Sequence, residues 1–175
     1  MDHREYTPLQ ELRLTPASYI VLGLVEWAGT ATPYDLKRYA AASVGNLWSI
    51  QHAQLYSEPA RLAKAGYLKE KREDGGRRRK TYSITARGRR TLSSWLAEPA
   101  SETAELRDPG LLKLFFGADP KLIAPQQVEI HERKLAAYER IHAGLAGTDL
   151  RGPRLTLEAG IRAQRAQIGF WRDLA

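Results

Sequence analysis

One segment of the chain, residues 67–85, alternates polar and apolar side chains in the manner of a β-hairpin, and helical patterns precede and follow it. Residues 67–72 and 80–85 are two short strand candidates. Asp74-Gly75-Gly76 lies between them, and Asp-Gly is a strong signal for the tight turn of a hairpin. The chain is therefore predicted to be mainly α-helical with a single small hairpin.

Two helix starts before the hairpin carry the same signal. Thr15-Pro16 and Thr32-Pro33 each place a capping threonine before a proline, whose missing N–H costs nothing at the first helical position. These pairs predict two helices, of which the first ends at Gly29.

A third helix is predicted from Ser49, an N-cap candidate, to Gly66, which suits the end of a helix. Pro59 predicts a kink or a restart near Ser57, because proline removes one backbone hydrogen bond and clashes with the carbonyl four residues back. The start of this helix is polar. The side chains expected to face outward are Gln51, His52, Gln54 and Ser57.

The chain after the hairpin is predicted to be helical. Thr85 caps a fourth helix, and the polar residues 98–108 indicate a linker between two domains, residues 14–97 and 109–175. Beyond the linker, side chains recur at alternating three- and four-residue steps along a long helix, as in a coiled coil. This stripe consists of Val128, His131, Leu135, Tyr138, His142 and Leu145. A final helix carries Leu157, Ile161, Ile168, Trp171 and Leu174 on roughly one side.

Positive charge is concentrated in the first part of the sequence. Residues 1–99 contain 16 Lys and Arg against 10 Asp and Glu, whereas residues 100–175 contain 11 against 10. A basic half beside a nearly neutral half suggests a polyanionic partner for the first half. Charge alone does not distinguish nucleic acid from a membrane surface.

The composition excludes several classes of protein. The absence of cysteine excludes disulfides and thiolate metal sites and fits a reducing compartment. No apolar run approaches the roughly 20 residues of a membrane span, and the polar start does not resemble a secretory signal. We therefore expect a cytoplasmic protein without a metal or cofactor. Phosphate-binding, dinucleotide and zinc-protease motifs are missing, so we do not expect an enzyme.

Three helices, a basic hairpin and a fourth helix are the parts of a winged helix-turn-helix. A helix fits the major groove of DNA, where its first residues reach base edges, and a basic hairpin reaches the backbone or the neighbouring minor groove. The candidate DNA-binding residues are Ser49, Gln51, His52, Gln54 and Tyr56 of the third helix and Arg77, Arg78, Arg79 and Lys80 of the hairpin. The competing interpretations are a solvated loop for the cations and a core position for Tyr56.

Several phrases occur in a fixed order along the chain, beginning with LTPASYIVLGLVEWAG, TPYDLKRY and HAQLYSEPARLAKAGYL. They resemble the first two helices and the recognition helix of the PadR family of transcriptional regulators. GRRRKTYSITARGRRTLSSWL resembles the wing and fourth helix, and ELRDPGLLKLFF resembles the start of the C-terminal domain of longer members. Many members of the family have a proline directly after the central tyrosine and an apolar residue two positions further on. Ser57-Glu58-Pro59 departs from this commonest pattern.

The resemblance implies a homodimer that binds an inverted repeat in double-stranded DNA and represses transcription. Each subunit would consist of the winged helix-turn-helix and a C-terminal helical dimerisation domain. The expected dimerisation residues are Val128, Leu135, Tyr138, Leu145, Ile161, Ile168 and Trp171. In some family members a small aromatic molecule releases the dimer from DNA, but the sequence does not identify an effector here.

Two interpretations stay open for His131 and His142. They are either partly buried, hydrogen-bonded histidines or part of a pocket that senses a ligand or a proton. Trp48, Trp95 and Trp171 are expected in the core, although one of them could line such a pocket. The alternative to a DNA-binding regulator is a basic, non-enzymatic module that binds another polyanion or a protein.

Overall fold

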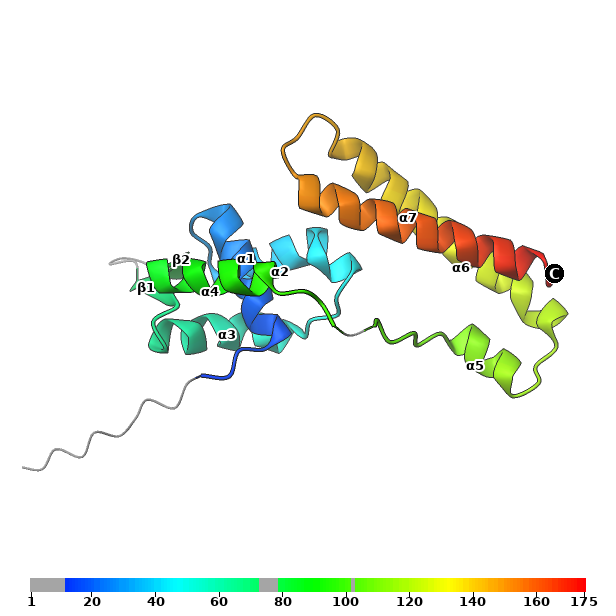
Figure 1. Ribbon diagram of the computed structural model, residues 1–175, viewed down its shortest axis with the longest axis horizontal. Coiled ribbons are helices and arrows are strands. Elements are labelled where there is room, and N and C mark those ends of the chain that lie inside the picture. Colours follow the sequence, from blue (N-terminus) through cyan, green and yellow to red (C-terminus); the bar gives the residue numbers. More distant parts are fainter. Residues whose placement is uncertain (1–11, 73–78, 102) are drawn as a thin grey trace, which may run out of the picture. The chain divides into compact units, whose positions relative to one another are not determined.

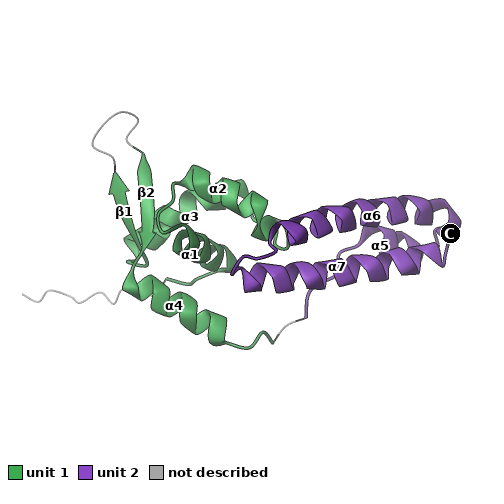
Figure 2. Ribbon diagram, turned by 90° about the horizontal axis from the view of Figure 1, so that it is seen from above, with its two compact units in different colours: residues 1–101 green, residues 102–175 purple. Residues whose placement is uncertain are grey.

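The structure is a computed structural model that describes residues 12–72, 79–101 and 103–175. It divides the chain into two compact units, residues 1–101 and 102–175 (Figure 2). As predicted, the fold is mainly helical with one antiparallel two-stranded hairpin in the described residues (Figure 1). No helix in these parts of the chain is long and apolar enough to cross a membrane.

Unit 1 contains the hairpin and the helices around it. Its elements are α1 (Pro16–Ala28), α2 (Pro33–Ala42), the short 3-10 helix η1 (Val44–Asn46), α3 (His52–Lys64), β1 (Leu68–Arg72), β2 (Lys80–Ile84) and α4 (Ala86–Ala97). The predicted caps of α2 and α4 are present. Thr32 and Asp35 cap α2 reciprocally, each backbone N–H donating to the other side chain over 3.1 Å. Thr85 caps α4 by accepting a bond from the N–H of Gly88.

The hairpin gains a third, very short partner from the segment between α1 and α2. β1 and β2 pair from Leu68 opposite Ile84 to Arg72 opposite Lys80. On the other side of β2, Ala31 and Tyr82 exchange both backbone hydrogen bonds, at 2.9 and 3.0 Å. Two strands alone are marginally stable in water. This bridge and the helices of unit 1 therefore hold the hairpin in place.

The core of unit 1 joins α1, α2, α3 and the hairpin. Its fully buried side chains include Val21, Leu22, Val25, Leu36, Leu55, Leu62 and Tyr82. Gly88 lets α4 pack closely against the segment that enters β1, because a Cβ at this position would lie 2.2 Å from the carbonyl oxygen of Tyr67. That oxygen is also held by the backbone N–H and the hydroxyl of Thr85.

Helix α3 differs from the prediction at its start and in its middle. It begins at His52 with Gln51 as N-cap, so Ser49 lies ahead of the helix rather than capping it. It also continues through Pro59, which is buried. Proline cannot donate to the carbonyl of Leu55, but the buried side chains on both sides of Pro59 face the same core and keep the helix in one piece.

A buried polar network secures this part of α3 to α1. The hydroxyl of Ser18 donates to the Glu58 carboxylate over 2.6 Å, and Arg61 donates to the same carboxylate from Nε over 2.8 Å and from a terminal nitrogen over 2.5 Å. Burial opposes ionisation of Glu58, but the bonds from Arg61 and Ser18 outweigh it and lower the pKa of the carboxyl. Glu58, within the segment that departs from the family pattern, therefore has hydrogen-bond donors for its buried carboxylate.

Unit 2 consists of α5 (Pro109–Phe115), α6 (Pro120–Gly144) and α7 (Arg151–Arg172). Helices α6 and α7 form a long antiparallel pair (Figure 1). Asp108 caps α5 by accepting bonds from the N–H groups of Gly110 and Leu111. Helix α6 runs through Pro125, and α7 begins at Arg151.

The α6 stripe that the sequence assigned to a dimer surface packs mainly against α7 of the same chain. Tyr138, Ile161, Ile168 and Trp171 are buried within unit 2. Gly160 makes room for Tyr138, since a Cβ there would lie 2.8 Å from the ring. These four side chains pack within unit 2, and their assignment to the dimer surface stays a prediction. An apolar stripe looks the same whether it meets a helix of its own chain or of another.

Candidate nucleic-acid interface

The first two turns of α3 separate cleanly into an exposed polar face and a buried face. Leu55, Glu58, Pro59 and Leu62 are buried against the core. The exposed side chains on the other face are Gln51, His52, Gln54, Tyr56 and Ser57. Tyr56 is 49% exposed, which decides against a core role. All four α3 candidates from Gln51 to Tyr56 are thus accessible on unit 1 alone.

Gln51 and Gln54 are linked at the start of α3. The N–H of Gln51 donates to Oε1 of Gln54 over 3.3 Å, and the N–H of Gln54 donates to the carbonyl of Gln51 over 3.0 Å. This capping arrangement holds the Gln54 side chain against the helix N-terminus. A base contact by its Oε1 would replace the longer, solvent-exposed bond.

The segment before α3 is exposed and partly apolar. Ser49 is exposed, and so are Leu47, at 65%, and Trp48, at 49%. The expectation that Trp48 belongs to the core is therefore wrong, as it is for Trp95, which is 42% exposed and stacks on Tyr19 with 4.4 Å between ring centres. Hydrophobicity alone did not reveal which tryptophans are enclosed, because enclosure depends on neighbours distant in sequence.

The structure describes two of the four predicted wing cations, Arg79 and Lys80. Arg77 and Arg78 lie outside the described residues. Arg79 is exposed just before β2. Lys80 is the first residue of β2, and its Nζ lies 3.2 Å from a carboxylate oxygen of Glu70 on β1. Lys80 is therefore already ion-paired within the chain.

Glu70 accepts hydrogen bonds from three donors in the middle of the hairpin. Besides Lys80, it accepts a bond from Nε of Arg72 and one from the hydroxyl of Tyr82, each over 3.0 Å. The bond from Arg72 contributes most to lowering the pKa of Glu70, and those from Tyr82 and Lys80 add to it. Burial and the bond to Glu70 raise the pKa of Tyr82 to about 12. Sequence reasoning missed this cluster, although the hairpin register places Glu70 opposite Tyr82.

The two candidate effector histidines both face α7. Nδ1 of His131 lies 2.7 Å from Oε1 of the buried Gln164. Nε2 of His142 is buried and 3.5 Å from the Glu158 carboxylate, without hydrogen-bond geometry to any described group. His131 therefore fits the interpretation as a partly buried, hydrogen-bonded histidine.

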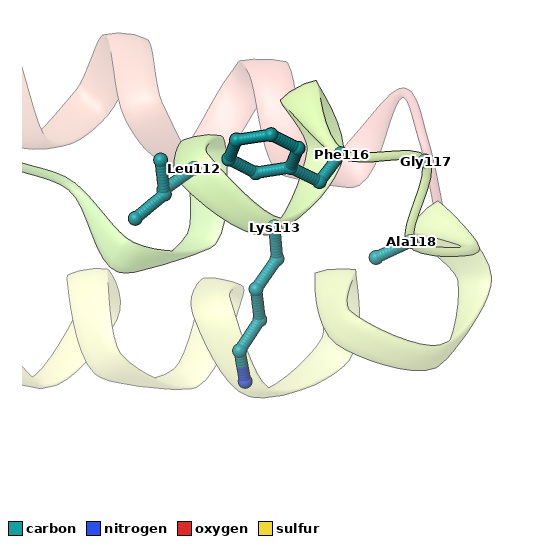
Figure 3. A pocket seen from close by; sticks show the side chains of 5 residues that line it. All are labelled: Leu112, Lys113, Phe116, Gly117 and Ala118. Atoms are coloured by element: carbon teal, nitrogen blue, oxygen red, sulfur yellow. The ribbon is translucent and has the colours of Figure 1, made fainter.

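Unit 2 exposes an apolar surface around α5. Leu112, Phe115, Phe116 and Leu122 are between 60% and 82% exposed. A shallow hollow of about 460 Å³ lies here, lined by Leu112, Lys113, Phe116, Gly117 and Ala118. Figure 3 shows Leu112 and Phe116 on the same side of α5, with Lys113 pointing the other way. Neither His131 nor His142 lines this hollow.

An exposed polar helix start beside a basic two-stranded hairpin, both built on a three-helix core, defines the winged helix-turn-helix class. The chain matches the PadR-like family of transcriptional regulators. The model of that family matches residues 21–94, and the model of the virulence activator alpha C-terminal domain matches residues 106–174. The resemblance seen in the sequence, including the longer two-domain type, is confirmed.

Two relatives that are transcriptional regulators support this match. The negative transcriptional regulator PadR of Bacillus subtilis is 31% identical over 102 residues, which are 56% of this chain and 54% of that protein. A probable transcriptional regulator of Mycobacterium tuberculosis is 30% identical over 94 residues, 53% of this chain and 49% of that protein. These matches span about half the length of each relative.

Solved structures share the fold over most of the chain. Bacillus subtilis PadR in complex with operator DNA superposes with a TM-score of 0.77 at 22% identity, covering 89% of this chain and 95% of that one. The Vibrio cholerae virulence activator AphA gives a TM-score of 0.67 at 25% identity, covering 90% and 95%. The arrangement of the helices and the hairpin is therefore that of these regulators.

Proposed function

We propose that the chain is a sequence-specific DNA-binding transcriptional regulator that acts as a dimeric repressor. The exposed polar face of α3 supports this proposal most directly, because it offers amide, imidazole and hydroxyl groups on a rigid helix. Glutamine can bond adenine bidentately in the major groove, and imidazole and hydroxyl groups can serve bases or phosphates. The proposed DNA-binding residues are Ser49, Gln51, His52, Gln54 and Tyr56, together with Arg77, Arg78, Arg79 and Lys80.

Replacing Gln54 by alanine is expected to weaken binding to the operator and to relax the sequence preference. The loss should be about 1–3 kcal/mol if the amide makes a base contact, whereas affinity for unrelated DNA should hardly change. Fluorescence anisotropy with a duplex selected from a random pool by the wild-type protein, and with a scrambled duplex, measures both quantities.

Gln126→Ala is the matched control, since Gln126 is an exposed glutamine on α6 in unit 2. It should bind both duplexes like the wild type. An unchanged ratio between the two affinities in Gln54→Ala would remove Gln54 from the site. A wild-type protein that selects no duplex at low salt would end the proposal and favour a protein-interaction module.

The exposed apolar surface of unit 2 supports a dimer. Contiguous exposed apolar groups mark interaction surfaces more often than scattered ones do. We propose that Leu112, Phe115, Phe116 and Leu122 form part of the contact between subunits. The half-buried Val128, Leu135 and Leu145 stay in the proposed surface, because their side chains are only partly covered by α7.

Phe115→Asp is expected to dissociate the dimer, because it would place a charge in an apolar contact. The dissociation constant should rise at least roughly 30-fold, the effect of removing about 2 kcal/mol at an interface hot spot. Sedimentation velocity at micromolar concentration measures this change. Leu96→Asp, at an exposed leucine of α4 in unit 1, should leave the dimer intact. A wild-type protein that sediments as a monomer would contradict the dimer itself.

Further properties follow from the relatives. The Bacillus subtilis protein is named a negative regulator, and one structure of it contains p-coumaric acid. We therefore propose repression, release from DNA by a small aromatic effector, a cytoplasmic location and no catalytic activity. His131 and His142 stay candidates for effector contact only if α6 and α7 separate, since both face α7.

A further inference from the structure

Glu70 is the one acidic residue among the described parts of the hairpin, residues 67–72 and 79–85. Around it lie five cations, namely Lys69, Lys71, Arg72, Arg79 and Lys80. Two of the five, Arg72 and Lys80, contact its carboxylate at 3.0 and 3.2 Å, and the others do not appear among its partners. The wing is therefore less cationic than its sequence suggests, in a way that depends on a single side chain.

A buried tyrosine hydroxyl also holds the Glu70 carboxylate in place. The hydroxyl of Tyr82 donates to it over 3.0 Å, and the Tyr82 side chain is 1% exposed. The backbone of Tyr82 is fixed on one side by β1 and on the other by Ala31. This anchor means that Glu70 cannot easily turn away with its cations, so Arg72 and Lys80 must leave the carboxylate before they can contact a phosphate.

We propose that Glu70 is a positioning residue that limits how many DNA phosphates the wing engages, by holding Arg72 and Lys80, the strand pair nearest the turn. The inference rests on the proposed DNA binding. Phosphate contacts carry no sequence information and raise affinity for any duplex. An anchored carboxylate beside two wing cations lowers this sequence-independent affinity and leaves Arg79, outside the cluster, to meet the backbone.

The proposal predicts that Glu70→Gln binds random-sequence DNA more tightly than the wild type does. Glutamine keeps an acceptor for Tyr82 and removes the charge that holds the cations. One additional phosphate contact steepens the slope of log affinity against log salt by about 0.9, which corresponds to a roughly eightfold gain at about 0.1 M salt relative to 1 M. Anisotropy titrations of the full chain with a scrambled duplex at several salt concentrations measure the slope.

Two controls separate this mechanism from a general effect of charge. Glu26→Gln removes a comparable carboxylate on α1, which is ion-paired with Arg89 of α4 at 3.0 Å. This variant should change the affinity for DNA less than twofold. Glu70→Gln in a background with both Arg72→Met and Lys80→Met should also give less than a twofold gain, because the cations that Glu70 restrains are absent. An equal gain in either control would overturn the proposal.

A second comparison tests the same idea without altering Glu70. Lys80→Met should reduce the salt slope by much less than Arg79→Met does, because the Glu70 carboxylate competes with phosphate for Lys80. Arg79→Met should reduce the slope by about 0.9. Equal losses for the two variants, or no gain in Glu70→Gln while the wild type binds DNA, would overturn the proposal alone. A wild-type protein that binds no DNA at about 50 mM salt would overturn both this proposal and the proposed function.

Discussion

Trp171→Ala is expected to remove most of the stability of unit 2. The Trp171 side chain is completely buried. It lies where all three helices of the unit meet, since a Cβ on Gly110 of α5 would be 2.9 Å from both the Trp171 ring and the Gln127 side chain of α6. Truncating a buried tryptophan to alanine typically costs about 3–5 kcal/mol. Whole domains are stable by only about 5–15 kcal/mol.

Urea unfolding followed by far-ultraviolet circular dichroism measures this loss. The unfolding transition of unit 2 should move to a lower urea concentration. Trp95→Ala is the matched control, because Trp95 is partly exposed and mainly stacks on Tyr19. It should cost only about 1 kcal/mol. Trp171→Phe should lie closer to the wild type than Trp171→Ala, since Nε1 of Trp171 has no hydrogen-bond partner among the described residues. Equal stability of Trp171→Ala and the wild type would contradict the packing of α5 onto α6 and α7.

Glu58→Ala is expected to be the most damaging polar substitution in unit 1. It leaves Arg61 and the buried Ser18 hydroxyl without their shared acceptor. Removing one partner of a buried pair costs about 3–5 kcal/mol, and we expect about 3 kcal/mol because the Arg61 side chain is 35% exposed and regains water. Chemical denaturation of unit 1 at neutral pH measures the cost.

The same network predicts a dependence of stability on pH. The pKa of Glu58 is lower in the folded chain than its ordinary value of 4.5. Its contribution is therefore fully present above that value and is lost as the pH falls through the lower, folded value. Glu58→Gln lacks this contribution, so its stability should converge on that of the wild type in acid. A difference between the two proteins that stays constant from pH 7 to about pH 2 would show that the carboxylate is not ionised in the fold.

Local signals in the sequence accounted for much of unit 1. Threonine before proline marked the starts of α1 and α2, and Thr85 marked that of α4, because capping depends on residues within one turn. The two strands were also predictable from alternation around Asp-Gly. The exposed face of α3 followed from helical spacing alone, and the structure places its polar residues as expected.

Features that depend on distant neighbours were not predictable in this way. Pro59 suggested a break, but α3 continues because side chains on both sides of Pro59 are buried in one core. Glu58 also accepts a bond from Ser18, 40 residues away. Ile168 and Trp171 looked like a surface between subunits, since a stripe does not show which helix covers it. Lys80 looked like a free cation until strand pairing placed Glu70 beside it. In each case the neighbour that matters is not adjacent in the sequence.

The backbone bridge between Ala31 and Tyr82 limits how such a chain can change in length. Because both hydrogen bonds join the segment after α1 to the middle of β2, an insertion or deletion between Gly29 and Thr32 would shift the entry of α2 against the hairpin. The polar segment 98–101 and 103–108 makes no such pairing in its described residues. Changes in length should therefore accumulate in the linker during divergence, while the four residues between the first two helices keep their number.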